Sequence, residues 1–214
     1  MISKYWLIIL GLIVVSALIL SGIHPYDRAT WLMEIAPVLV AIPVLVFTYR
    51  RFPLTGLLYV LITIHAIILI VGGSYTYARV PLGSWLEEFL SLSRNPYDKI
   101  GHFMQGFVPA LIAREIFVRG GYVIGGRMIS FLAICVAMVI SATYELFEWW
   151  AALALGQGAE DFLGTQGDPW DTQSDMFMAL VGAISSLATL SSLHDRQIVA
   201  LQIAVHPPQE QTKT

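Results

Sequence analysis

The sequence GTQGDPWDTQSD at residues 164–175 runs directly into the apolar segment MFMALVGAISSLATL. If these residues form one membrane helix, Asp168 takes the N-cap position and Pro169 the first helical position. Asp171 then falls in the first turn, where a carboxylate meets free backbone N–H groups. Asp175 has no such explanation, because seven residues at about 1.5 Å each place it roughly 10 Å along the helix. Asp171 and Asp175 share a face, so the stretch predicts a membrane helix with a polar face that needs a partner.

The composition of the whole chain indicates a polytopic membrane protein. Of its 214 residues, 57% are hydrophobic and only 13% are charged, and the mean hydropathy is +0.70. About a quarter of the residues of a soluble domain are charged. We therefore expect an all-α bundle of about six transmembrane helices, each long enough to cross about 30 Å of hydrocarbon. The expected spans are Tyr5–Gly22, Trp31–Tyr49, Leu54–Gly73, Ile100–Val118, Arg127–Leu155 and Pro169–Leu190.

The first span, the C-terminal residues and the single cysteine support further expectations about the domain organisation of the chain. The first span is longer than the apolar core of a signal peptide, so we expect it to remain as an anchor. One transmembrane domain should cover residues 1–195, followed by a flexible cytoplasmic tail at residues 196–214. Cys135 is the only cysteine, which excludes an intramolecular disulfide. The net charge of -3 identifies no partner, and no basic stripe suggests nucleic acid, so membrane lipids are the expected partners.

The distribution of lysine and arginine predicts the orientation of the bundle. With both termini in the cytoplasm, more basic residues lie inside than outside, and the aspartate stretch opens on the outer face. The inner side then holds Lys4, Arg50, Arg51, Arg119, Arg127, Arg196 and Lys213, and the outer side holds Arg28, Arg79, Arg94 and Lys99.

A short helix is expected on the outer side between the third and fourth spans. Residues 74–93 can place Trp85 and Phe89 on one face of a helix and Glu87 and Glu88 on the other. This amphipathic pattern is typical of an interfacial or re-entrant helix.

The start of the fourth span, NPYDKIGHFMQG at residues 95–106, carries a second polar stripe. Asp98, His102 and Gln105 follow i, i+4, i+7 spacing and so share a helix face. Asp98 can simply cap the helix and hold His102. Alternatively, His102 points one nitrogen into a site while Asp98 fixes its tautomer. Gly106, like Gly101, leaves a thin side where another backbone can approach.

A third polar pair lies near the outer end of the fifth span. Glu145 and Glu148 share a face about 26 Å from the inner end. Three helices thus place acidic groups at matching depth on one side of the membrane. Such carboxylates must share protons, meet a cation or bind a positively charged ligand. A divalent cation such as Mg²⁺, Mn²⁺ or Ca²⁺ is one possible cofactor, and its candidate ligands are Asp171, Asp175, Glu145, Glu148 and His102.

Three sequence blocks resemble the signature blocks of the YjdF family of bacterial inner-membrane proteins. They are YDKIGHF at residues 97–103, ELFEW at residues 145–149 and GTQGDPWDTQSDM at residues 164–176, and the resemblance extends from about residue 5 to residue 190. It implies a multi-pass protein of the bacterial cytoplasmic membrane and supports the location of the site, without implying a reaction.

A looser pattern is similar to the VanZ-like proteins. Ala179 stands where that pattern has Asn, and Glu148 stands where it often has Gln, so a shared fold need not mean shared chemistry. Carried over residue by residue, the pattern falls on Asp98, Lys99, His102, Glu145, Glu148, Asp175 and Gly182.

Three functional hypotheses follow, and the first is binding or remodelling of a lipid-linked envelope component. Its head group would enter the outer polar pocket, where the candidate ligand-binding residues are Asp98, Lys99, Gln105 and Gln173.

The second hypothesis is a metal-dependent intramembrane hydrolase or transferase in which a bound cation activates water and His102 moves the proton. Its candidate catalytic residues are His102, Asp175, Glu145 and Glu148. The third is a proton- or cation-coupled transporter, although no internal repeat is evident. Beside these stands a purely structural role, in which the polar residues join three helices. The sequence identifies neither the substrate nor the oligomeric state.

Overall fold

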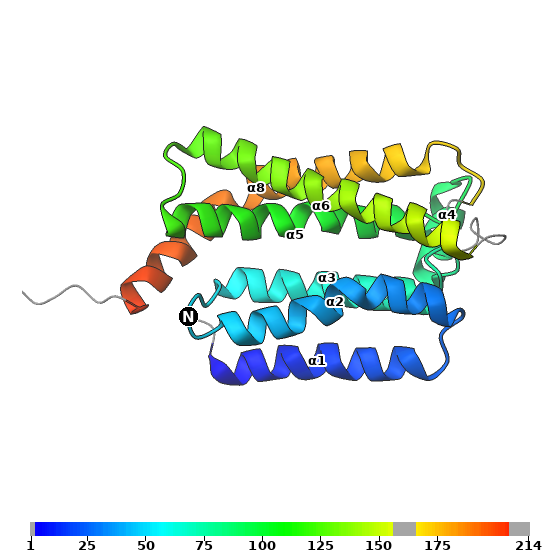
Figure 1. The fold of residues 1–214 in the computed structure, drawn as a ribbon, viewed down its shortest axis with the longest axis horizontal. Coiled ribbons are helices and arrows are strands. Elements are labelled where there is room, and N and C mark those ends of the chain that lie inside the picture. The colour runs from blue at the N-terminus through cyan, green and yellow to red at the C-terminus, as the bar shows by residue number, and fades with distance from the viewer. Residues whose placement is uncertain (1–2, 156–165, 206–214) are drawn as a thin grey trace, which may run out of the picture.

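The computed structural model describes residues 3–155 and 166–205, and within these ranges the chain forms seven helices and no strand. Six of the helices are long and run alongside one another, and one short helix lies across one end of the bundle (Figure 1). The elements are α1 (Lys4–Ile23), α2 (Arg28–Thr48), α3 (Gly56–Ser74), α4 (Pro81–Leu90), α5 (Tyr97–Gly120), α6 (Gly126–Leu155) and α8 (Asp171–Val205). The all-helical membrane bundle predicted from the sequence is confirmed.

The long helices form two layers. Helices α1, α2 and α3 make one layer, and α5, α6 and α8 make the other (Figure 1). Helix α3 packs against α5 and links the two layers. The end of the bundle that carries α4 is called the α4 end below. The first residues of α5 and α8 and the last residues of α6 lie at this end.

Helix α5 is the most polar of the long helices and lies between the others. By length and composition, five of the described helices can cross a membrane, namely α1, α2, α3, α6 and α8. Helix α5 is as long as these, but it carries a row of buried polar side chains. Because α3, α6 and α8 surround it, those side chains face protein instead of lipid. We therefore count α5 as the sixth span.

Small residues bring α5 and α8 together more closely than side chains would permit. A β-carbon added to Gly106 would lie 1.7 Å from the carbonyl oxygen of Ala179, and one added to Gly182 would lie 2.0 Å from that of Phe103. The thin side expected at Gly106 is therefore the face that receives α8. At Gly101 the neighbour is the ring of Tyr77, 3.0 Å from such a β-carbon. The close approach of the two backbones places the polar stripe of α5 against the aspartates of α8.

A buried ionic network holds the opposite end of the bundle. Glu115 accepts hydrogen bonds from the backbone N–H of Thr55 (3.1 Å) and from Arg119 (2.7 Å), and its other oxygen lies 2.8 Å from His194 Nε2. Glu115 thereby caps the start of α3, for which the Thr55 side chain makes no cap hydrogen bond. Arg114 pairs with Asp195 at 2.7 Å. This network is fully partnered, as a structural role for Arg114 and Glu115 requires.

Two helix boundaries differ from the sequence-based expectations. Helix α8 begins at Asp171, so Asp168 lies before the helix, where its carboxylate accepts a hydrogen bond from the Trp170 N–H at 2.9 Å. At its other end α8 continues through Val205, ten residues beyond the expected domain end at residue 195. Ile198 in this extension is 2% exposed, and its burial explains why the helix continues. The remainder of the expected tail, residues 206–214, lies outside the described residues.

Helix α4 matches the short amphipathic helix expected outside the membrane core. The rings of Trp85 and Phe89 stack with centroids 5.4 Å apart, and both are exposed. Asn95 ties α4 to the start of α5 by donating to the Val80 carbonyl at 3.1 Å. The turn before α5 is thereby fixed, together with Arg94, which it carries.

Candidate functional site

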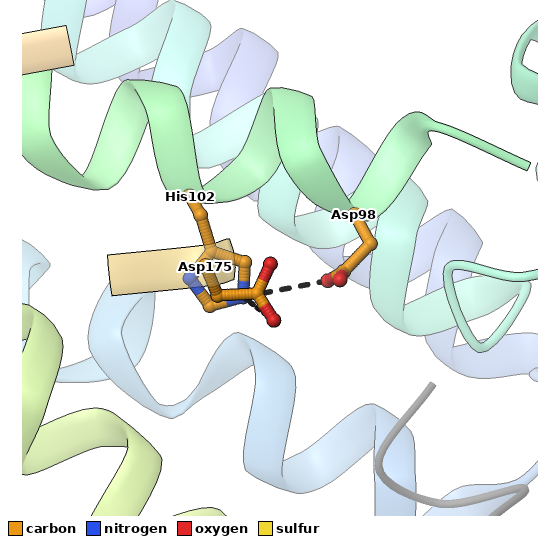
Figure 2. Close-up of side chains that lie close together, drawn as sticks. All are labelled: Asp98, His102 and Asp175. Atoms are coloured by element: carbon orange, nitrogen blue, oxygen red, sulfur yellow. Dashed lines mark ion pairs between the residues drawn. The ribbon is translucent and has the colours of Figure 1, made fainter. Parts of the chain in front are cut away.

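The polar residues predicted from α5, α6 and α8 converge at the α4 end. Figure 2 shows its central group, in which Asp98 and His102 come from α5 and Asp175 comes from α8. His102 Nε2 lies 3.4 Å from Asp98 Oδ1 and 3.9 Å from Asp175 Oδ2. One donor atom from each of the three residues lies within 4.8 Å of the others. All three side chains are buried, so the group is enclosed by protein.

The other nitrogen of His102 faces α6 and the interior of α5. Nδ1 lies 3.1 Å from Gln105 Oε1 and 3.7 Å from Glu145 Oε1. Both ring nitrogens therefore face oxygen atoms, and a ring that donates from both is the positively charged form. His102 can accordingly serve as a cation of the cluster or, after losing one proton, as its base.

Lys99 and Arg94 neutralise the aspartates of α8. Lys99 Nζ lies 2.7 Å from Asp171 Oδ1 and 2.5 Å from Asp175 Oδ1. Arg94 also donates to Asp171 and lies 3.7 Å from Asp168. Asp171 is therefore held by two cations, a stronger arrangement than the helix cap that its position in the sequence suggests.

The electrostatics of Arg94 and Tyr77, which lie outside the spanning helices, reflect this concentration of charge. Burial lowers the pKa of Arg94, but its hydrogen bond to Asp171 and the negative charge around it outweigh burial and raise the pKa above its ordinary value. Burial, followed by the negative charge of Glu34 and Asp98, holds the pKa of the Tyr77 hydroxyl well above its usual range. Both groups thus keep their protons and offer donors to the carboxylates.

Two buried carboxylate oxygens accept no hydrogen bond from the described part of the chain. They are Asp98 Oδ2 and Glu145 Oε1, and each residue is 7% exposed. Buried acceptors normally find a partner, so each unsatisfied oxygen requires an explanation. A bound cation, a water molecule or a ligand donor would supply one.

Negative groups outnumber positive ones in this cluster. The buried carboxylates are Glu34, Asp98, Glu145, Glu148, Asp171 and Asp175. Against these six stand Lys99, Arg94 and, when protonated, His102. Because Lys99 and Arg94 are engaged with Asp171 and Asp175, the remaining negative charge lies toward α6, where Glu148 is within electrostatic range of Glu145 and His102.

The structure places most, but not all, of the predicted site residues in the cluster. The residues that it brings together are Asp98, Lys99, His102, Gln105, Glu145, Glu148, Asp171 and Asp175. Gln173 is exposed, and two positions along a helix from Asp171 and Asp175 it points away from their face.

Sequence reasoning missed two members of the cluster. Arg94 was counted only as a basic residue of the outer side, since its approach to Asp171 depends on the turn that precedes α5. Glu34 of α2 was not among the predicted site residues, yet it is 4% exposed and accepts a hydrogen bond from Tyr144 at 2.8 Å. A carboxylate two turns into an apolar helix was the available signal, because such residues are usually functional.

Comparisons with known proteins agree with the membrane fold. A family model described as "Predicted membrane protein (DUF2238)" matches residues 6–196. The "Inner membrane protein YjdF" of Escherichia coli (strain K12) is 64% identical over 181 residues, which cover 85% of this chain and 87% of that protein. No solved structure matches. The resemblance to YjdF is confirmed, and that to the VanZ-like proteins stays a prediction. The chain therefore belongs to the DUF2238 family of membrane proteins and is a multi-pass protein of the inner membrane.

Proposed function

We propose that the protein binds a lipid-linked component of the cell envelope and holds its head group for remodelling. In this proposal the α4 end faces the outside of the cell, as the excess of basic residues at the opposite end favours. The head group enters the cluster at that end from the outer leaflet. Burial of ionisable groups within a membrane bundle costs free energy. Such residues are retained mainly where they bind a ligand or move an ion or a proton.

The observation that carries this proposal is the pair of buried oxygens that accept no hydrogen bond, in a cluster with excess negative charge. Asp98 Oδ2 and Glu145 Oε1 accept no hydrogen bond from the described residues. Lys99 Nζ, at 3.9 Å from the first oxygen, and His102 Nδ1, at 3.7 Å from the second, lie beyond hydrogen-bond distance. The nearby cations of Lys99 and Arg94 are already engaged. A ligand that fits must therefore bring donors and positive charge, as an amine in a head group does. Helix α4, with exposed Trp85 and Phe89, lies at the same end of the bundle as the cluster (Figure 1), and in this proposal its aromatic side chains contact the lipid head groups.

The test is the identity of the lipid that remains with the protein after extraction. We would isolate wild type and the variants Glu145→Gln, His102→Ala and Asp168→Asn in polymer-bounded discs of native membrane and compare the retained lipids by mass spectrometry. Wild type and Asp168→Asn should enrich one lipid class over the bulk membrane, because Asp168 lies at the rim. Glu145→Gln and His102→Ala should lose that enrichment at equal protein abundance. Equal enrichment in all four proteins would refute the proposal.

A metal-dependent hydrolase is the second candidate, and the Asp98, His102 and Asp175 group specifically favours it. Three donor atoms within 4.8 Å of one another can hold a divalent cation with open positions for water. The oxygen of that water would join the cleaved ester. Because His102 would be occupied as a ligand, a carboxylate outside the group, such as Glu145, would take the proton and pass it to the departing oxygen. Lys99, at 2.5 Å from Asp175, competes with the ion for the same carboxylate. Head-group binding is therefore ranked first.

A further inference from the structure

An apolar groove leads from the polar cluster into the membrane between the two helix layers. The cavity has a volume of about 610 Å³ and is lined by residues of α2, α3, α5, α6 and neighbouring turns. This volume lies within the ~300–1,000 Å³ of typical small-molecule sites. Nearly all the lining side chains are apolar, and examples from the different elements are Val44, Leu69, Val108, Ile112 and Ile140.

Three polar side chains of the groove lie on the side of the cluster, and two others, Thr48 and Tyr122, lie at the far end of the groove. Gln105 lines the groove and lies 3.1 Å from His102 Nδ1. Tyr144 also lines it and donates a hydrogen bond to Glu34, which joins α6 to α2 across the two layers. The Nε2 atom of His65, another lining residue, has no hydrogen-bond partner in the described ranges. The groove therefore has a polar mouth, shared with the cluster, and an apolar body.

The length of the groove matches the thickness of one layer of acyl chains, and the groove runs from about two turns inside the α4 end toward the opposite end of the bundle. Along α5 the lining runs from Gln105 to Ile116, and along α2 from Pro37 to Thr48. At about 1.5 Å per residue each run is roughly 16 Å long. The hydrocarbon core of a bilayer is about 30 Å thick, so one leaflet contributes about 15 Å.

We propose that this groove holds one acyl chain of a phospholipid whose head group carries an amine. This inference rests on the proposed function, because it places the head group of the same lipid in the cluster. The positive charge of the amine compensates the excess carboxylates near Glu145. The phosphate stays outside the cluster, because Lys99 and Arg94 are already engaged with the aspartates of α8. The apolar lining surrounds the acyl chain in place of the other lipids of the bilayer. Beyond the mouth of the groove, the acyl chain therefore contacts no buried polar group. The ligand class is thus an aminophospholipid bound by its head group and by one chain.

A second apolar cavity provides an internal control. It has a volume of about 460 Å³, lies among α1, α2 and α3, and does not include any residue of the cluster. Val15 lines only this cavity and Val44 only the groove. Both valines are partly exposed, at 43% and 52%, so tryptophan at either position fills a cavity without forcing apart a packed interface.

The experiment uses phosphatidylethanolamine with a photoactivatable diazirine in one acyl chain. Wild type and the variants Val44→Trp and Val15→Trp are reconstituted in vesicles that contain this probe, irradiated, and mapped by peptide mass spectrometry. We expect labelling of the α5 segment 105–116 in wild type and Val15→Trp and a severalfold loss in Val44→Trp. Equal labelling of that segment in Val44→Trp and Val15→Trp would refute the groove as the chain site. Equal labelling by phosphatidylglycerol with the same chain would refute the requirement for an amine.

Two further arms separate this inference from the proposed function. If Glu145→Gln retains full labelling of segment 105–116, chain binding does not need the head-group site, and the combined proposal fails. If wild type retains an enriched lipid class that Glu145→Gln loses, but the probe never labels segment 105–116, the groove inference fails while the proposed function stands. Competition of the label by polyprenyl phosphate at equal concentration would replace the phospholipid with a lipid carrier and overturn the assignment.

Discussion

Gly106 of α5 lies against the backbone of Ala179 in α8, so close that a β-carbon on the glycine would lie 1.7 Å from the alanine carbonyl oxygen. This contact determines the geometry of the site, because it sets the distance between the helices that carry His102 and Asp175. No side chain fits between the two backbones at this point. The close approach thus depends on a residue about one turn from His102, which it positions.

Replacement of Gly106 by leucine should therefore force α5 away from α8. Overpacking a tight interface costs about 1–3 kcal/mol, so the melting temperature of the purified protein should fall. Gly11 is the matched control, because a β-carbon at that position meets nothing within 4 Å. Gly11→Leu should leave the melting temperature unchanged or raise it slightly, since glycine weakens a helix interior. Equal effects of the two substitutions would show that the contact does not position α8.

The sequence predicted the depth of the site but could not predict which helix faces meet. Depth follows from counting residues at 1.5 Å each, and this count placed Asp98, Glu145 and Asp175 at the same end of the bundle. Rotation of each helix about its axis and the choice of neighbours depend on packing. The approach of α2 to α6, which joins Glu34 to Tyr144, and the turn that brings Arg94 to Asp171 therefore required the structure.

Lys99 and Asp175 should be strongly coupled. Their charged atoms are 2.5 Å apart, and Asp175 is 3% exposed. Removal of one partner from a buried pair costs about 3–5 kcal/mol, because it leaves the other charge without compensation. Lys99→Met and Asp175→Asn should each be destabilising, and the double variant should cost less than the sum of the two single variants. The measurement is a double-mutant cycle of unfolding free energies in detergent.

The pair of Arg114 and Asp195 is the control for this cycle. Its atoms are 2.7 Å apart, but the Asp195 side chain is 53% exposed. An exposed pair contributes about 0–1 kcal/mol, so Asp195→Asn should have a small effect. Additive costs for Lys99→Met and Asp175→Asn would show that the lysine does not compensate the aspartate.

The orientation of the bundle can be tested by the accessibility of single cysteines. In a Cys135→Ala background, Glu88→Cys reports on the α4 end and Arg127→Cys on the opposite end, and both positions are exposed. Because basic residues favour the cytoplasm, a membrane-impermeant maleimide added to intact spheroplasts should label Glu88→Cys and spare Arg127→Cys. The reverse pattern would place the cluster on the cytoplasmic side and remove the outer-leaflet lipid from the proposed function.

Asp27 should make stability depend on pH at the acidic end. The hydrogen bond from the Thr30 N–H, 2.7 Å long, lowers the pKa of the Asp27 carboxyl below its ordinary value of 3.8. A lowered pKa contributes stability above the pKa of the unfolded chain, and this contribution is lost as pH falls through the folded value. Asn also caps helices and does not titrate. The melting temperature of wild type should thus match that of Asp27→Asn at pH 7 and fall below it as the pH drops under 3.8. Parallel curves throughout would show that ionisation of Asp27 does not contribute to stability.

The last prediction asks what neutralises the carboxylates of the cluster. If a divalent cation binds Asp98, His102 and Asp175, chelation should lower the melting temperature and re-addition should restore it. The stabilisation follows RT ln(1 + [L]/Kd), which is about 2.7 kcal/mol at a concentration of 100 Kd. His102→Ala removes one of the three donors and should abolish this response, whereas Asp168→Asn, at the rim, should retain it. Absence of any chelator effect in wild type, with no metal found by elemental analysis, would eliminate the metal-dependent hydrolase. The excess negative charge would then have to be balanced by bound protons or by the positive head group of a lipid, and stabilisation by added phosphatidylethanolamine but not by phosphatidylglycerol would identify the head group as the compensating charge.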